Sequence, residues 1–249
     1  MSDIYQAPSA ELRTPVSNNE YGSVERGLSG DYEFTIGGAL SEAWEKTAGR
    51  KGTFNLAMLL YVVVAILLSI GTDLLVTAIS LTVPEPIILI ASSLTLQILI
   101  NLILLPAWAG LIILGMRASV DSPITATMIF DHFRYALRLV GTLILMYLLI
   151  LIGLVLLVLP GIYLIIAYSM ALQLVVEKDM SPWQAMETSR KVVSKKWFTM
   201  FGFYIVALVI TLVSALLLFI PLFWTLPMMI IASGLIYRNM FGLERSTIE

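Results

Sequence analysis

Long stretches without a charged residue set the strongest limit on how this chain can fold. Residues 87–115, 139–176 and 198–237 contain none, and residues 54–82 contain only Asp73. A run of about 20 apolar residues is long enough to cross the hydrocarbon core of a bilayer as a helix. The sequence therefore predicts an all-α, polytopic membrane protein.

The composition supports this class and excludes several chemistries. The 249 residues are 59% hydrophobic and 13% charged, whereas soluble domains carry about 25% charged residues. Because there is no cysteine, disulfides, thiolate metal sites and cysteine nucleophiles are excluded. The single histidine, His132, excludes a histidine-rich metal cluster. We therefore expect no cofactor and no metal site.

Prolines and polar connectors divide the apolar part into six spans. They are predicted at 54–81, 87–115, the two halves of 139–176, 198–219 and 222–237. A single helix over 139–176 would measure about 57 Å, nearly twice the thickness of the hydrocarbon core. Pro160–Gly161 is therefore predicted to be the turn of a helical hairpin. Pro106 is expected to kink the second span.

The spans belong to a chain of three parts. Residues 1–33 are polar, show no helical or strand period and lack the apolar segment of a signal peptide, so they are predicted to be a disordered cytoplasmic tail. Residues 34–242 form the six-helix membrane domain. It opens with an amphipathic helix over 34–50 that places Trp44 at the membrane surface. Residues 243–249 are predicted to be a short cytoplasmic tail.

The placement of basic residues predicts the orientation. All 15 lysines and arginines lie before residue 54, in the connectors 116–138 and 177–197, or after residue 237. With six spans these regions fall on one side of the membrane, and the positive-inside rule makes that side cytoplasmic. Both termini are therefore predicted to be cytoplasmic. Arg117 and Arg238, at the inner ends of spans, are expected to snorkel to the surface.

A short repeat links the two cytoplasmic connectors. SPITA at 122–126 recurs as SPWQA at 181–185, and each copy is followed by an amphipathic segment and a hairpin. ALSEAWEK at 39–46 occupies the same place before the first hairpin. We therefore predict three units, each a cytoplasmic amphipathic helix followed by a membrane hairpin.

The second connector, EKDMSPWQAMETSRKVVSKKW at 177–197, is the first candidate site. Ser181 is expected to cap a helix that begins at Pro182, with Gln184 closing a capping box. The apolar face of this helix is predicted to lie in the cytoplasmic leaflet. Contacts with lipid headgroups are assigned to Trp183, Arg190, Lys191, Lys195, Lys196 and Trp197. The alternative is that these charges only set the topology.

Polar residues inside the spans are the second candidate site. These residues are Asp73, Gln97, Asn101 and Gln173. Asp73 is either a hydrated carboxylate near the outer interface or part of a proton or cation relay. The three amides either hydrogen-bond neighbouring helices or contact a substrate.

The sequence contains no recognisable catalytic set. Asp131 and His132 are adjacent, and neighbours in sequence point to different faces of a helix. No serine has a recognisable base within its motif, and there is no phosphate-binding GxxxxGK loop. Catalytic activity and nucleic-acid binding are therefore not expected.

Several features between residues 160 and 242 resemble one group of bacterial proteins. They are Pro160–Gly161, Glu177 or Asp179, Ala185 with Ser189, Lys196–Trp197, and YRNMFG at 237–242. Together they resemble the uncharacterised bacterial inner-membrane proteins of the YciC-like type, which are related to the membrane domain of some glycerophosphodiester phosphodiesterases. The resemblance implies a six-helix bacterial inner-membrane protein. It implies no activity, because residues 34–242 do not include the phosphodiesterase domain.

The sequence thus predicts a non-enzymatic inner-membrane protein that acts in envelope maintenance, lipid interaction or assembly of a membrane complex. Its expected partners are membrane lipids and a membrane protein or a second copy of the chain. The alternative is a small transporter or channel that uses the polar residues inside the spans.

Overall fold

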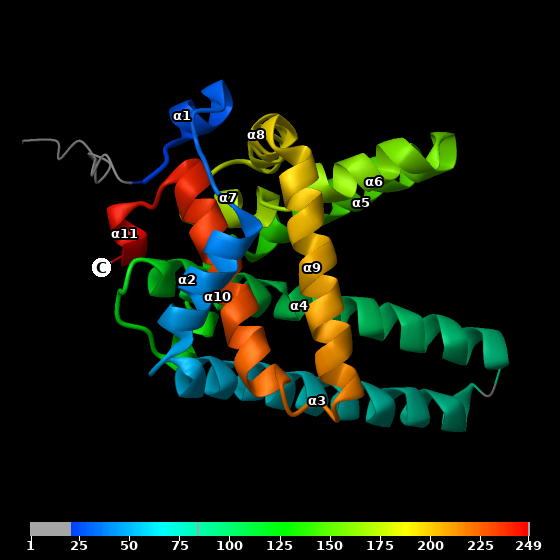
Figure 1. Cartoon of the computed structure of the whole chain (residues 1–249). Helices are drawn as coiled ribbons and strands as arrows, with labels where there is room; N and C mark the ends of the chain where they lie inside the picture. Colours follow the sequence, from blue (N-terminus) through cyan, green and yellow to red (C-terminus); the bar gives the residue numbers. More distant parts are fainter. Residues whose placement is uncertain (1–20, 84, 249) are drawn as a thin grey trace, which may run out of the picture.

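The computed structural model describes residues 21–83 and 85–248, and every regular element in these ranges is helical (Figure 1). The α-helices are α1 Val24–Ser29, α2 Ile36–Thr47, α3 Lys51–Thr82, α4 Pro86–Ser119, α5 Ala136–Leu156, α6 Val158–Ala167, α7 Ala171–Glu177, α8 Pro182–Lys195, α9 Trp197–Leu216, α10 Leu222–Phe241 and α11 Arg245–Ile248. Two short 3-10 helices, η1 Ala126–Phe130 and η2 Phe133–Tyr135, precede α5. The predicted all-α class is confirmed.

Five helical segments are long and apolar enough to cross a membrane, so the chain is a multi-pass membrane protein. They are Lys51–Thr82, Pro86–Ser119, Ala126–Leu156, Val158–Glu177 and Trp197–Leu216. The sixth predicted span corresponds to α10, which has 20 residues like α9 but a less apolar composition. The rest of the protein buries 11 of those 20 residues. A helix covered by protein needs less apolar surface than one that faces lipid.

Three antiparallel helix pairs, α3 with α4, α5 with α6 and α9 with α10, make up most of the chain (Figure 1). The tips of α3–α4 and α5–α6 point away from the centre, whereas the α9–α10 pair runs across α3. At the α9–α10 tip, the Phe223 carbonyl accepts a hydrogen bond from Asn55 (2.9 Å), and Lys51 lies 5.8 Å from the centre of the Trp224 ring, so this tip lies beside the first turns of α3.

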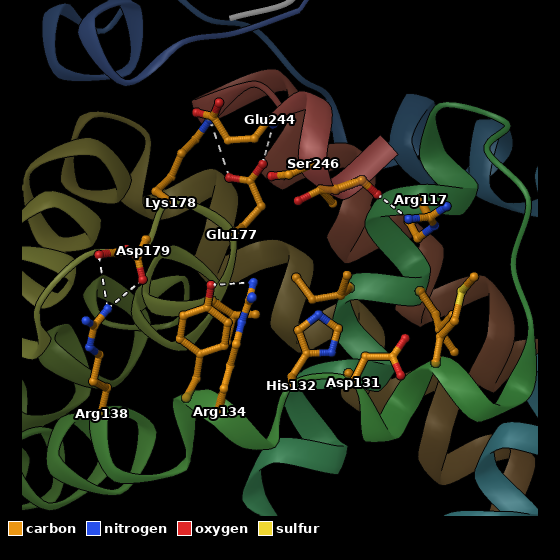
Figure 2. Close-up of a pocket in the computed structure, with 17 residues that line it drawn as sticks. Arg117, Asp131, His132, Arg134, Arg138, Glu177, Lys178, Asp179, Glu244 and Ser246 are labelled. Atoms are coloured by element: carbon orange, nitrogen blue, oxygen red, sulfur yellow. Dashed lines mark hydrogen bonds and ion pairs between the residues drawn. The ribbon is translucent and has the colours of Figure 1, made fainter. Parts of the chain in front are cut away.

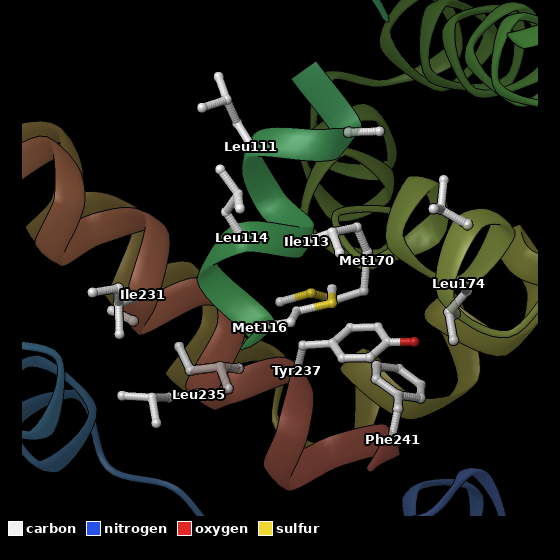
Figure 3. Close-up of a cluster of buried hydrophobic side chains, with 14 of the residues drawn as sticks. Leu111, Ile113, Leu114, Met116, Met170, Leu174, Ile231, Leu235, Tyr237 and Phe241 are labelled. Carbon is white, nitrogen blue, oxygen red and sulfur yellow. The ribbon is translucent and has the colours of Figure 1, made fainter. Parts of the chain in front are cut away.

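The hydrophobic core lies at the connector ends, where Met116 and Leu114 of α4 meet Ile231 and Tyr237 of α10 (Figure 3). In contrast, the most apolar part of α3 contains no buried residue. The parts of α3 and α4 next to their shared tip are therefore left for lipid or another protein to cover.

The turn between α5 and α6 does not lie at Pro160–Gly161, so this prediction was wrong. Leu157 alone is extended between the two helices, and Pro160 lies in the first turn of α6. Proline is tolerated there because the amide hydrogen that it lacks would have no helical partner. Gly161 lies close to α5, since an added Cβ would be 2.8 Å from the Leu154 nitrogen. At Pro106, α4 continues without ending.

Two glycines allow α4 and α10 to cross at very short range. A Cβ added at Gly234 would lie 2.5 Å from the carbonyl carbon and oxygen of Gly115. A Cβ added at Gly115 would collide with the carbonyl oxygen of Ile230. Small residues at helix crossings in membranes let the backbones approach each other in this way.

Both terminal segments are folded further than predicted. Residues 21–33 form α1 and an extended segment: the Gly22 amide donates to the Arg238 carbonyl (3.1 Å), and the buried Tyr32 hydroxyl donates to the Val192 carbonyl (2.8 Å). Leu243, which precedes α11, and Thr247, which lies within α11, are both buried. The tails predicted at 1–33 and 243–249 are therefore structured over 21–33 and 243–248, and the rest lies outside the described residues.

The two copies of the connector repeat differ in the structure after the Ser-Pro pair. Only the second copy starts an α-helix directly, and the first is followed by η1. The copies share an aspartate in the left-handed region, Asp121 (φ 59°) and Asp179 (φ 53°). Asp121 pairs with Lys46 (2.6 Å) and Arg50 (2.9 Å), and the hydrogen bond from Lys46 lowers the pKa of this carboxyl. Asp179 pairs with Arg138.

The surface helix α8 begins at Pro182 as predicted, but its apolar face packs on protein. Ser181 makes no capping hydrogen bond, so the predicted capping box with Gln184 is wrong. The buried residues of α8 are Ala185, Met186, Ser189, Val192 and Val193. The helix α8 packs against α1, α5, α6, α7 and α9, so these residues are covered by protein and do not lie in the cytoplasmic leaflet as predicted.

Ser189 forms hydrogen bonds with backbone groups where the neighbouring membrane segment is interrupted. The helix from Val158 to Glu177 is interrupted between Ala167 and Ala171, which leaves backbone groups without helical partners. The buried Ser189 hydroxyl donates to the Ala167 carbonyl (2.7 Å) and accepts from the Met170 amide (3.2 Å). One side chain thus satisfies a carbonyl and an amide at the break.

We expect Ser189→Ala to lower the free energy of unfolding by about 2 kcal/mol, because two buried backbone groups lose their partner. Ser181→Ala on the same helix is the matched control, since Ser181 is exposed and its side chain makes no cap bond. Denaturation by sodium dodecyl sulfate in mixed micelles measures both. Equal stability of the two variants would contradict the role assigned to Ser189.

Candidate functional site: a charged cavity at the connector ends

A cavity of about 790 Å³ opens where α4, α7, the connector before α5 and the C-terminal segment meet (Figure 2). Its wall includes four basic and four acidic residues together with His132. They are Arg117, Arg134, Arg138, Lys178, Asp131, Glu177, Asp179 and Glu244. These charges come from the connectors 116–138 and 177–197 and from the C-terminal segment, so the fold concentrates them in one place.

One wall of the cavity is a buried junction around Glu177. Its side chain is 0% exposed. It accepts a hydrogen bond from the Tyr237 hydroxyl (3.0 Å) and another from the Glu244 amide. Lys178 lies 3.4 Å from Glu177 and 2.9 Å from Glu244. The junction ties α7, α10 and the C-terminal segment together.

Arg117 and Arg238 do not snorkel to the surface as predicted. Both are buried. Arg117 donates to the carbonyl oxygens of Thr247 (2.7 Å) and Pro123 (3.1 Å). Arg238 donates to the Ser119 carbonyl (2.7 Å) and to Glu42 (3.1 Å). Each guanidinium therefore links the C-terminal end of its helix to another segment. Backbone carbonyl groups accept the hydrogen bonds that water would accept at a surface.

Arg134 and Arg138 lie on the same side of the cavity but have different partners. Arg138 forms an ion pair with Asp179 (2.5 Å). Arg134 donates to the Tyr135 hydroxyl (3.0 Å) and its guanidinium stacks over that ring at 4.8 Å. Among the described residues no carboxylate lies within ion-pair distance of Arg134. Its charge is therefore available to a ligand.

Asp131 and His132 both line the cavity. The expectation that they point to different faces of a helix was wrong, because they lie in the turn between η1 and η2. The Nδ1 atom of His132 is buried and has no hydrogen-bond partner within the described part of the chain. A buried polar atom without a partner is costly, so a ligand group or water in the cavity would satisfy it.

The residues predicted to contact headgroups lie outside this cavity, on or directly after α8. Arg190 and Lys191 pair with Glu187 at 2.8 Å and 3.3 Å, and the Arg190 hydrogen bond lowers the pKa of Glu187 to about 2. Trp183 and Lys195 are exposed.

The two residues after α8 contact other parts of the chain. Lys196 lies 5.4 Å from the centre of the Tyr32 ring. Trp197 donates to the Tyr163 carbonyl (3.2 Å) and stacks on Phe201. Since Trp197 is occupied by these contacts, its assignment to lipid headgroups is not supported.

The polar residues inside the spans are not gathered into one site. Asp73 is exposed on α3, and Gln97 and Asn101 are exposed on α4. Asn101 donates to the Gln97 carbonyl of its own helix (2.8 Å). In the described ranges no hydrogen bond or ion pair joins the side chain of Asp73 to either amide. Gln173 lies apart from them, buried on α7, with its Oε1 atom unpartnered in the described structure.

The fold and the cavity define an all-helical, multi-pass membrane protein with a charged cavity at the connector ends of its helices. Within the described residues, no group of three or more metal-binding side chains is arranged to hold an ion. The chain matches no protein-family model, no curated protein and no solved structure. The resemblance to YciC-like proteins therefore stays a prediction.

Proposed function

We propose that the chain is a non-enzymatic, six-span protein of the bacterial inner membrane that binds phospholipids at its cytoplasmic side. The headgroup would occupy the cavity, and the role would be in envelope maintenance or in assembly of a membrane complex. In a six-span arrangement with α10 as the last span, all 15 basic residues of the chain would lie on one side. The positive-inside rule supports the cytoplasm as that side.

The observation that carries the proposal is an apolar stripe that starts beside the cavity. Five exposed residues of α5 share one helical face: Leu137, Ile144, Leu148, Leu151 and Val155. Leu137 is 89% exposed and lies between Arg134 and Arg138, which line the cavity. A soluble anion would use only the charged cavity. A phospholipid would place its phosphate there and its acyl chain along the stripe.

Arg134 is the best-placed group for the phosphate. A guanidinium forms short, charge-assisted hydrogen bonds with phosphate oxygens, and Arg134 has no competing carboxylate among the described residues. Asp131 in the same cavity suits a headgroup that also carries an ammonium group.

We expect Arg134→Gln to retain about tenfold less phospholipid than the unchanged protein, since a charge-assisted hydrogen bond is lost. Native mass spectrometry after gentle extraction measures the bound lipid. Lys191→Gln is the matched control, because it removes an exposed charge on α8 outside the cavity. Normal lipid retention by Arg134→Gln together with loss in Lys191→Gln would instead place the lipid site on α8.

The orientation has an independent test, because the chain contains no cysteine. We expect a cysteine introduced as Glu85→Cys at the α3–α4 tip to react with an impermeant maleimide from outside the cell. Thr127 is exposed in the first connector. We expect Thr127→Cys to react only after the inner membrane is permeabilised. The reverse pattern would overturn the cytoplasmic placement of the connectors.

A transporter is the alternative, but no contact among the described residues favours it. The polar residues on which it would depend, Asp73, Gln97 and Asn101, are exposed on α3 and α4, and within the described ranges no hydrogen bond or ion pair joins Asp73 to either amide.

A further inference from the structure

The outer half of α4 carries an uncovered seam with the spacing of a coiled coil. Ile87, Ile90, Leu94, Gln97 and Asn101 follow one another at intervals of three, four, three and four residues. This spacing places them along one side of a helix that can pack against another helix. All five are exposed, with Ile87 at 81% and Ile90 and Leu94 at 60%. No other helix of the described chain covers this side.

The seam is distinct from the side of α4 that packs within the chain. The less exposed positions of this part of α4 are Leu89, Ser92, Leu96 and Ile100. On a helix of about 3.6 residues per turn, each of them lies more than a quarter turn from the middle of the seam. In Figure 1 α3 runs beside this half of α4, and the two helices contact each other. The hairpin thus uses one side of α4 and leaves the seam free.

Two amides make lipid a poor cover for this seam. The Gln97 side chain has no hydrogen-bond partner in the described structure. Asn101 uses one amide hydrogen on the Gln97 carbonyl (2.8 Å) and leaves its oxygen without a donor. Lipid tails offer neither donors nor acceptors, whereas a facing helix with polar side chains offers both.

We propose that a second copy of this chain covers the seam, so that the protein is a dimer with two α4 helices packed in parallel. Two copies inserted in the same membrane share one orientation, and identical residues therefore lie at the same depth. Asn101 would meet the partner's Asn101, and Gln97 the partner's Gln97. An amide carries both donors and acceptors, so it is complementary to itself, which a charged group is not. A buried asparagine in such a seam also fixes the register of two parallel helices.

Single cysteines test the seam directly, because the chain has none of its own. We expect Leu94→Cys to form at least about tenfold more disulfide-linked dimer than Leu99→Cys on oxidation of membranes, since only facing Cβ atoms come within bonding reach. Leu99 is the matched control, because it is 47% exposed on the same helix but lies off the seam. Equal cross-linking at the two positions, or none at Leu94→Cys, would overturn the proposal.

The contribution of the amides has its own readout. In the Leu94→Cys background, Gln97→Leu with Asn101→Leu should weaken self-association about tenfold, as two interhelical amide contacts are lost. Folding is not at risk, because both positions are exposed in one chain, and size-exclusion chromatography checks this. Cross-linking unchanged by the double substitution would refute the amide pairing. Since the seam and the cavity lie on different parts of the protein, this result is independent of lipid binding.

Discussion

Gly234→Leu is expected to prevent the chain from accumulating as a folded protein. A Cβ at this position would lie 2.5 Å from the backbone of Gly115, and a leucine adds three more carbon atoms. Backbone atoms cannot move aside by a change of rotamer, so α4 and α10 would have to separate. Separation would open the core around Leu114 and Leu235. The loss of stability should exceed about 3 kcal/mol, the upper end of ordinary overpacking.

Gly71→Leu is the matched control for this prediction. Gly71 lies inside α3, and a Cβ added there meets no atom within 4 Å. The same substitution should therefore leave the protein folded, and it should favour the helix by about 1 kcal/mol because glycine is a poor helix former. Thermal unfolding and size-exclusion chromatography in detergent compare the two variants. Equal behaviour would mean that α4 and α10 do not cross at Gly115 and Gly234.

The sequence predicted the helical class and the approximate limits of the membrane helices because uncharged runs leave few other folds open. It failed where the packing of one helix on another decides the outcome. Pro160–Gly161 looked like a turn, yet proline suits the first turn of α6 and glycine allows α5 to approach. Similarly, α10 can carry Arg238 and Asn239 near its C-terminal end because other parts of the protein, and not lipid, cover that end.

The candidate site could be predicted only in part. Basic residues at the ends of the spans indicated a charged cytoplasmic side, but the strongest pattern lay in α8, where Glu187 neutralises much of the charge. The cavity depends on long-range proximity: Glu244 and Arg134 lie far apart in the sequence, and no local pattern shows that both line one cavity. The i, i+4 spacing of Arg134 and Arg138 was the one local signal that placed two cations on the same side of the connector.

We expect removal of the buried carboxylate of Glu177 at the cavity wall to lower the stability of the protein nearly as much as Gly234→Leu. Glu177→Leu would leave the Tyr237 hydroxyl and the Glu244 amide without an acceptor and would take a negative charge from beside Lys178. Breaking a buried, hydrogen-bonded charge pair costs about 3–5 kcal/mol. The connections from α7 to α10 and to the C-terminal segment would be lost together. Unfolding by sodium dodecyl sulfate measures the change.

Glu187→Leu is the control that separates burial from charge. Glu187 also pairs with two basic residues, Arg190 and Lys191, but its side chain is 33% exposed, whereas that of Glu177 is 0% exposed. Exposed ion pairs contribute about 1 kcal/mol or less because water competes for both partners. The Glu177 variant should therefore unfold at a much lower detergent fraction. Equal stability of the two variants would mean that water reaches Glu177. The contact of Glu177 with Tyr237 of α10 would then not be buried, and the prediction would be wrong.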